Sequence, residues 1–289
     1  MLALLLAICG VAEAQDFANA EIRTIPLRGN LRLLKSEGSN IIVSTGRDGT
    51  LLVDDEYAEL ADKLRASLTA VGALPVKTII NTHWHNDHTG GNEALARDGA
   101  LIIAQENTAR RMQSDQTMSL YGKQVAYPPI AWPKLIVQLS LQLRWNDDVV
   151  DLLHLGPAHT DGDLVVFFRS QNVLSTGDVL VLNEYLPPYF DDLNGGSMEG
   201  MIHGANRLLE LVNDKTIIVP GHGEPADRIG LLRYRDRVVA IRDQIKAAIS
   251  RGLSEDEVVA LHPVGDFAGA GKGTDRWVRI LYREYRNSR

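Results

Sequence analysis

Short runs of apolar residues, separated by turn residues, dominate the first part of the chain. Gly, Ser and Asp lie between these runs, and this punctuation predicts a meander of short strands. The predicted strands cover residues 31–35, 40–45 and 49–55. Apolar positions then recur at helical spacing within residues 56–70, at Leu60, Leu64 and Leu68. This spacing predicts a helix with one buried face, which Gly72 ends.

Strand and helix patterns alternate along the rest of the chain. Further strands are predicted at residues 76–80, 100–103, 135–143, 148–155, 163–169, 172–175 and 216–220. Helices are predicted at residues 91–97, 197–212, 231–249, 254–261 and 274–287. Residues 118–134, which contain Gly122 and three prolines, are predicted to form a long loop. This order of elements predicts a layered α/β protein in which two similar halves pack sheet to sheet.

The first fourteen residues have the pattern of a secretory signal peptide. A short apolar stretch ends in an Ala-x-Ala sequence at Ala12 and Ala14, and it is too short to span a bilayer. A buried N-terminal helix is the alternative reading of residues 1–14. Cys9 is the single cysteine and would leave with the signal, so the mature chain would lack disulfides and thiolate metal ligands. We therefore expect an exported protein, periplasmic or secreted.

Composition and charge narrow the range of partners. The chain has 289 residues, of which 45% are hydrophobic, enough for a sizeable core without disulfides. Thirty basic and thirty-seven acidic residues leave a formal charge of -7, which does not favour nucleic acid or anionic lipid as a partner. No further segment is predicted to span a membrane. We expect a small-molecule substrate, and the sequence leaves the oligomeric state open.

The densest chemistry follows the predicted strand 76–80, in the stretch NTHWHNDHTGG. His83 and His85 are two residues apart, so in an extended segment their side chains point the same way and can bind one ion. Asp87 and His88 come where the chain turns into a helix, which can aim them at a second point nearby. Capping or surface polar residues are the alternative, but this spacing behind an apolar strand is typical of metal ligands.

Three more potential ligands follow other predicted strands. His159 comes after the strand 148–155, Asp178 after 172–175 and His222 after 216–220. Each lies beside Gly or Pro, which permit tight turns and close approach. Any one of them alone reads as an ordinary turn residue. Their shared placement, at loops that a rigid sheet positions, favours a common site.

These five separated motifs resemble those of the metallo-β-lactamase-fold hydrolases. The resemblance implies a four-layered αββα sandwich of two mixed sheets flanked by helices, with residues 20–230 as the catalytic domain and 231–289 as helices packed on it. It also implies two metal ions, most simply Zn²⁺, with iron or manganese as alternatives. By resemblance, His83, His85 and His159 hold one ion, Asp87, His88 and His222 hold the other, and Asp178 bridges both.

The resemblance implies a hydrolase that cleaves a β-lactam, lactone, ester or thioester with a hydroxide held by the two metals. Asp87 and Asp178 are expected to be catalytic as well as ligands, because they can orient the attacking water. Aspartate at position 178 resembles glyoxalase II-like enzymes and lactonases, whereas dedicated β-lactamases usually carry cysteine or serine there. The tail after residue 231 is similar to periplasmic zinc hydrolases of quinoprotein-linked systems.

Two other functions remain open for the same motifs. A phosphodiesterase of this fold is disfavoured by the acidic charge and the expected export. A non-hydrolytic diiron redox protein is disfavoured because His85 stands where that branch has glutamate. Substrate contacts are expected from Asn183 and Tyr185 in the loop 181–196, and from the aromatic residues of the loop 118–134. The histidines outside the motifs, His154, His203 and His262, are expected to be structural or solvent-facing.

Overall fold

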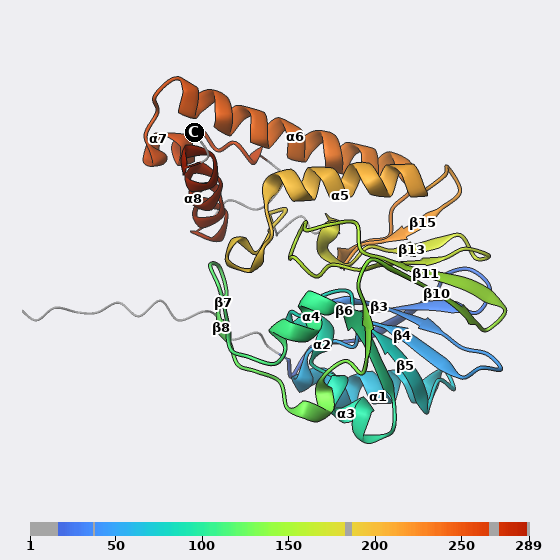
Figure 1. Cartoon of the computed structure of the whole chain (residues 1–289). Helices are drawn as coiled ribbons and strands as arrows, with labels where there is room; N and C mark the ends of the chain where they lie inside the picture. Colours follow the sequence, from blue (N-terminus) through green and yellow to red (C-terminus); the bar gives the residue numbers. More distant parts are fainter. Residues whose placement is uncertain (1–16, 37, 183–186, 266–271, 288–289) are drawn as a thin grey trace, which may run out of the picture.

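The computed structural model describes residues 17–36, 38–182, 187–265 and 272–287. Its centre consists of two mixed β-sheets that pack against each other (Figure 1). The first sheet has the order β1 (Arg23–Pro26), β2 (Leu31–Lys35), β3 (Asn40–Ser44), β4 (Thr50–Val53), β5 (Val76–Ile80), β6 (Leu101–Gln105) and β9 (Leu135–Val137). The second has the order β10 (Ser140–Trp145), β11 (Asp148–Leu153), β12 (Val165–Phe168), β13 (Val173–Ser175) and β15 (Ile217–Val219).

Each sheet combines antiparallel and parallel pairs. In the first sheet, β1 to β4 form an antiparallel meander, and β4, β5, β6 and β9 are parallel. In the second, β10 to β13 are antiparallel and β15 joins β13 in parallel. Parallel neighbours end at the same edge of a sheet, so the loops that follow them meet there.

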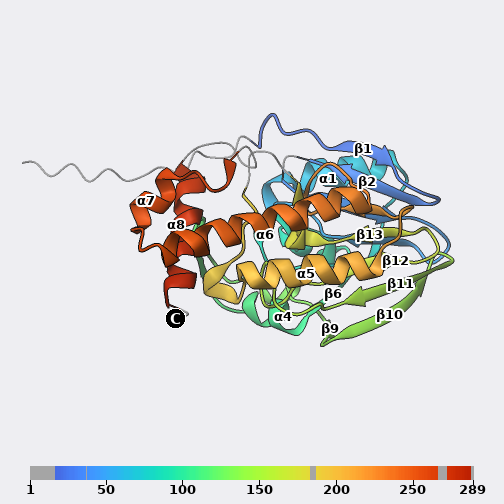
Figure 2. The ribbon, with the colours of Figure 1, turned by 90° about the horizontal axis from the view of Figure 1, so that it is seen from above.

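Helices cover the outer face of each sheet (Figures 1 and 2). The helices beside the first sheet are α1 (Ala61–Ala70), α2 (Asn86–Thr89), α3 (Asn92–Arg97) and α4 (Glu106–Arg111). Those on the side of the second sheet are α5 (Met198–Leu211), α6 (Arg228–Ser250), α7 (Glu255–Ala260) and α8 (Lys272–Asn287). In Figure 2, α5 and α6 run side by side over the second sheet. The predicted four-layered αββα sandwich is confirmed.

The two-residue period of the strands builds two cores from one set of residues. Leu33 and Ile42 pack between the sheets, whereas their neighbours Leu34 and Ile41 pack on the other face beneath Leu64 of α1. Side chains of a strand point alternately to opposite faces, so a strand of continuous apolar residues is buried on both sides. This explains why these runs are apolar throughout.

The sequence predictions for two segments that lie between β6 and β11 along the chain were wrong in detail. Residues 118–134 are not an irregular loop, because β7 (Gln116–Met118) and β8 (Gly122–Gln124) form a hairpin and Pro129–Ala131 form a short 3₁₀ turn, η2. The predicted strand 135–143 is two strands, because β9 pairs with β6 whereas β10 pairs with β11 in the other sheet. Both segments are apolar enough for a strand, and only the change of partner separates them.

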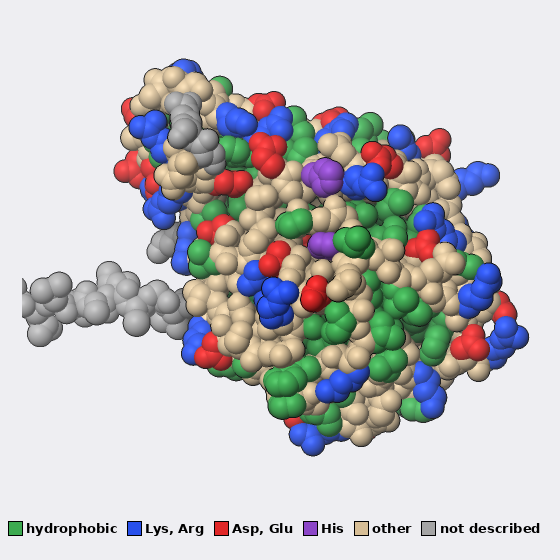
Figure 3. Space-filling view, viewed as in Figure 1, with side chains coloured by type: hydrophobic (Ala, Val, Ile, Leu, Met, Phe, Trp, Pro, Cys, Tyr) green, Lys and Arg blue, Asp and Glu red, His purple; other side chains and the backbone are tan. Residues whose placement is uncertain are grey.

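The surface shown in Figure 3 has no large area of a single charge. Lysine and arginine side chains alternate with aspartate and glutamate over that face. Within the described residues, no helix is both long enough and apolar enough to cross a membrane.

Candidate metal centre

The predicted metal ligands lie in segments that follow strands of both sheets. After β5 the chain continues through His83 and His85 into α2, whose first turn carries Asp87 and His88. The other three come from the second sheet. His159 lies between β11 and β12, Asp178 in the 3₁₀ turn η3 (Gly177–Val179) after β13, and His222 in the short strand β16 (His222–Gly223) after β15.

The fold brings all seven of these residues together. Their donor atoms form three overlapping groups, and within each group the atoms lie within 4.8 Å of one another. The groups are His83, His85 and His159; His83, His88 and Asp178; and Asp87, His88 and His222. The first and third groups are the two triads that the sequence motifs suggested.

Hydrogen bonds around the first group point three ring lone pairs at one another. His159 Nδ1 donates to the carbonyl oxygen of Tyr189 at 2.9 Å, and His85 Nε2 donates to Asp191 Oδ2 at 3.1 Å. The Thr82 hydroxyl donates to a carboxylate, so its oxygen accepts from His83 Nδ1 at 3.1 Å. These partners place the ring protons on the outer nitrogens. The inner nitrogens are left as acceptors.

The inner nitrogens of this group lie about as close together as the donors of one metal ion. His85 Nδ1 lies 3.1 Å from His83 Nε2 and 3.0 Å from His159 Nε2. With their protons on the outer nitrogens, no hydrogen bond can join these atoms, and their lone pairs repel. A tetrahedral zinc ion with Zn–N bonds of 2.0–2.1 Å holds its donors about 3.3 Å apart. The spacing and the tautomers therefore fit a metal ion.

The third group, together with Asp178, combines two histidines with two carboxylates. His88 Nδ1 donates to Asp54 Oδ2 at 2.8 Å, which leaves Nε2 facing the site. That nitrogen lies 3.3 Å from Asp87 Oδ2 and 3.4 Å from His222 Nε2. Asp178 Oδ1 is buried, accepts no hydrogen bond, and is 3.3 Å from His88 Nε2. Imidazole and carboxylate donors at these distances suit a second divalent ion.

The third group, with Asp178, differs from the first in its electrostatics. Burial lowers the pKa of both His83 and His159. Burial alone would raise the pKa of Asp87 and Asp178, but the neighbouring histidines outweigh it and hold both pKa values well below the usual range. The pKa of His222 rises to about 10 against the effect of burial, because Asp178 and Asp87 stabilise its charged form. A cation that binds this group therefore displaces protons.

Two glycines of the motifs allow these segments to approach closely. Gly221 precedes His222, and a Cβ atom there would lie 1.8 Å from Asp178 Oδ1. Gly177 precedes Asp178, has a φ of 50°, and would place a Cβ atom 2.7 Å from the side chain of Thr82. Neither position has room for a side chain, and Gly177 also has the left-handed conformation that glycine adopts without strain.

Two buried carboxylates that support the histidines were missed from the sequence. Asp54 follows β4 in the left-handed region (φ 64°) and accepts from Thr82 as well as from His88. Burial raises the pKa of Asp54 and His88 opposes the rise. Asp191 orients His85 from 106 residues away along the chain. An acidic run directly after a buried strand, DDE at 54–56, was the available signal for Asp54; Asp191 had none.

A cavity of about 610 Å³ opens onto the candidate metal centre. Five of the seven residues line it, namely His85, Asp87, His159, Asp178 and His222. The remaining lining comes from several separate segments, including the N-terminal segment and the β7–β8 hairpin. It consists of Phe17, Gly38, Tyr57, Glu59, Asn86, Met118, Tyr121, Lys123, Gln124, Val181, Pro187 and Tyr189.

The predicted substrate contacts are only partly placed by the structure. Asn183 and Tyr185 lie outside the described residues. Of the aromatic residues in the predicted loop, Tyr121 lines the cavity, whereas Tyr127 and Trp132 pack beneath it against Trp84. Tyr127 also hydrogen bonds through its hydroxyl to Thr89 in α2, so its role there is structural.

The histidines outside the motifs lie away from the metal centre. His154 follows β11, where its backbone NH bonds to Leu139 and its ring to the carbonyl oxygen of Asp163. His203 in α5 and His262 after α7 are exposed.

Comparison with known proteins assigns the family. The sequence profile described as "Metallo-beta-lactamase superfamily" matches residues 25–222, a span that contains all seven candidate ligands. The chain belongs to the metallo-β-lactamase superfamily. Members of this superfamily are largely hydrolases and usually bind zinc, which agrees with the donor set of this site.

Superfamily relatives with different chemistry are similar to this chain. It is 25% identical over 222 residues to the metallo-β-lactamase IND-1 of Chryseobacterium indologenes, a match covering 72% of this chain and 86% of that protein. It is 27% identical over 204 residues to 2,4-dinitroanisole O-demethylase subunit alpha of Nocardioides sp. (strain JS1661), covering 69% of this chain but only 57% of that subunit. A metallo-β-lactamase from Pontibacter korlensis has the same fold, with a TM-score of 0.59 at 18% identity over 75% of this chain and 99% of that one.

Proposed function

We propose that this protein is a dinuclear metal-dependent hydrolase that cleaves a carbonyl-centred bond in a small molecule. The observation that carries the proposal is the convergence of acceptor nitrogens and carboxylates beside a cavity. Four of the five rings, all but that of His222, also donate a hydrogen bond from their outer nitrogen to an acceptor. Such outer partners are what metal-binding histidines require. The bond class remains a β-lactam, lactone, ester or thioester.

The residues have distinct tasks in this proposal. His83, His85 and His159 would hold one ion, Asp87, His88 and His222 the other, and Asp178 both. Two bound Zn²⁺ ions would supply the Lewis acidity that lowers the pKa of water towards ~7 and polarises a carbonyl group. The carboxylates of Asp87 and Asp178 face the cavity and would orient the attacking water by accepting its hydrogen bonds.

The N-terminal segment bears on where in or outside the cell this protein works. We propose that residues 1–14 are removed and that the mature protein is exported, as the Ala-x-Ala pattern indicates. Phe17, the first described residue, lines the cavity. Cleavage after Ala14 would therefore leave only two residues before a part of the site. The N-terminal sequence of protein recovered from the periplasm or medium tests this directly.

A substrate panel tests the reaction class. Mature protein loaded with zinc is assayed on a chromogenic lactam, a lactone, an ester, a thioester and a bis-aryl phosphodiester. An aryl methyl ether is added because one relative is an O-demethylase. We expect cleavage of a carbonyl substrate that stops when a chelator removes the metal and returns with zinc. Cleavage confined to the phosphodiester, or chelator-insensitive cleavage, would refute the proposal.

The metal itself separates the hydrolase from a redox protein. Metal analysis of protein purified without added metal should find zinc, close to two equivalents, and no visible absorbance. Two equivalents of iron with visible absorbance bands would instead favour the diiron alternative.

A further inference from the structure

Two pairs of aromatic rings line the cavity. Phe17 and Tyr57 lie with their ring centroids 5.1 Å apart at a tilt of 57°. Tyr121 and Tyr189 meet edge to face with centroids 5.2 Å apart. All four residues line the cavity that leads to the metal centre. Aromatic side chains offer large apolar faces that bind flat apolar groups with little loss of side-chain entropy.

The Tyr121–Tyr189 pair connects the cavity wall to the metal centre. The Tyr189 ring lies 5.6 Å from the His159 ring and 6.5 Å from the His85 ring, and with the latter it is stacked at 23°. Tyr189 is buried, whereas 59% of Tyr121 is exposed. Tyr121 is thus the outer half of a wall whose inner half contacts two candidate ligands. A substrate whose reacting carbon reaches the metals would lie along this wall and cover the Tyr121 ring.

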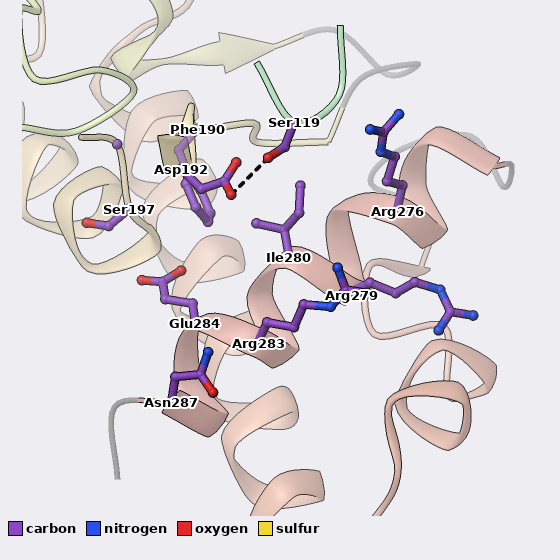
Figure 4. Close-up of a pocket in the computed structure, with 11 residues that line it drawn as sticks. Ser119, Phe190, Asp192, Ser197, Arg276, Arg279, Ile280, Arg283, Glu284 and Asn287 are labelled. Carbon is purple, nitrogen blue, oxygen red and sulfur yellow. Dashed lines mark hydrogen bonds between the residues drawn. The ribbon is translucent and has the colours of Figure 1, made fainter. Parts of the chain in front are cut away.

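The hairpin that carries Tyr121 is held at several points, so the ring has a defined position. Ser119 donates to Asp192 at 2.9 Å, an interaction visible in Figure 4. The side-chain amide of Asn194 donates to the carbonyl oxygen of Thr117 at 2.9 Å. Leu120 packs against the apolar core to which α5, α6 and α8 contribute. Arg276 of α8 reaches the carbonyl oxygen of Leu120 at 3.4 Å. The C-terminal helix therefore supports the hairpin from behind.

The charges in the cavity disfavour an anionic substrate. Apart from histidine, Lys123 is the one cationic side chain among the described lining residues. Its ammonium group lies 2.6 Å from Asp115 Oδ2 and is already paired. Glu59 adds a negative charge to the same lining. A carboxylate or phosphate away from the metals would therefore find no free cation here, and its desolvation would not be compensated.

We propose that this cavity selects uncharged substrates that carry an aromatic ring next to the scissile carbonyl, and that Tyr121 is the residue that determines this preference. The inference rests on the proposed function, because it assumes that the reacting carbonyl lies at the metal centre. The ring of the substrate packs against the exposed face of Tyr121. The phenol hydroxyl of Tyr121 is not needed for this contact.

Ethyl esters measure the preference without an aromatic leaving group. The zinc-loaded protein is assayed with a pH indicator on ethyl phenylacetate, ethyl acetate and the phenylacetate ester bearing a para-carboxylate on its ring. We expect Tyr121→Ala to lower kcat/KM for ethyl phenylacetate about 3- to 12-fold, mainly through KM, and to change ethyl acetate less than twofold. Tyr121→Phe should match the unmodified protein. The para-carboxylate ester should be the poorest aromatic substrate.

A control on the same hairpin excludes a general structural effect. Val125 follows β8, is 68% exposed and does not line the cavity, so Val125→Ala should leave all three esters unchanged. Equal losses of kcat/KM for ethyl phenylacetate and ethyl acetate in Tyr121→Ala would overturn the inference. A similar loss in Tyr121→Phe would overturn it too, because a hydrogen bond would then be the cause.

Binding without turnover separates this inference from the proposed function. Ligand-observed NMR compares 4-phenyl-2-butanone with 2-butanone on the zinc-loaded protein and on Tyr121→Ala. We expect only the phenyl ketone to bind measurably, and about 3- to 12-fold more weakly to the variant. If no carbonyl substrate of the panel is cleaved but this binding pattern holds, the proposed hydrolase fails and the aromatic preference stands. If esters are cleaved while both ketones behave alike, the preference fails alone.

Discussion

Replacement of Asp54 by asparagine tests how the protein prepares its second metal site. The Asp54 carboxylate is 1% exposed and accepts from His88 Nδ1 at 2.8 Å and from the Thr82 hydroxyl at 2.8 Å. Asparagine keeps the shape and tolerates the left-handed backbone at this position. Its amide nitrogen, however, is a hydrogen-bond donor, whereas the carboxylate oxygen of Asp54 accepts from His88 Nδ1. The ring proton of His88 would then move to Nε2, the atom that faces the site.

The expected loss of zinc affinity follows from what hydrogen-bond partners of metal-binding histidines contribute in other proteins. Loss of an outer partner of a metal-binding histidine typically lowers metal affinity about 10- to 100-fold, or about 1.4 to 2.7 kcal/mol. For Asp54→Asn we expect this loss for the ion held by His88. The affinity for the ion held by His83, His85 and His159 should fall less, because His85 and His159 keep their outer partners and only His83 depends on Asp54, through the Thr82 hydroxyl.

Competition with a chromophoric zinc chelator near neutral pH measures both affinities. Asp55→Asn serves as the matched control, since Asp55 is equally buried beside Asp54 but accepts from the backbone NH of Gly91 rather than from a ring. Thermal unfolding of the metal-free variants checks that both fold. The reasoning is refuted if Asp54→Asn binds both ions like the unmodified protein, or if Asp55→Asn weakens zinc equally.

Three further predictions follow from other contacts. Asp87→Ala should bind one zinc equivalent less and lose at least about 100-fold in turnover while remaining folded; metal analysis and kinetics would contradict this if both stay unchanged. Burial raises the pKa of Glu284 to about 7 from 4.5 in the unfolded chain, so the stability that it contributes is present at pH 4 and is lost as pH rises through 7. Glu284→Gln should therefore raise the melting temperature at pH 8 and leave it nearly unchanged at pH 4, whereas an equal shift at both would argue against this cause. Lys63 donates to three backbone carbonyls of residues 17–20, so Lys63→Met should release Phe17 and speed proteolysis of this segment. Arg65→Met, on the same helix but paired with an exposed aspartate, should not, and mass spectrometry of the fragments distinguishes them.

The hairpin and the supporting carboxylates show what sequence reasoning could not reach. Residues 116–124 are polar and short, and their strand pairing depends on partners such as Asp192 and Asn194, which lie about 75 residues further along the chain. Asp191 supports His85 from 106 residues further along the chain. Nothing in the local pattern marks these contacts, because they form only when the loops of two sheets meet.

The sequence alone predicted most of the elements, the layered fold and the seven candidate ligands. Apolar periodicity and turn residues are local properties, and each ligand follows a strand that such a pattern identifies. Only the tertiary structure decided which ring nitrogen faces inward, because that depends on distant acceptors such as Asp54 and Asp191. It also decided which aromatic residues reach the cavity: Tyr121 lines it, whereas Tyr127 packs beneath it. Side-chain direction at such positions is set by packing between segments, which one-dimensional spacing does not contain.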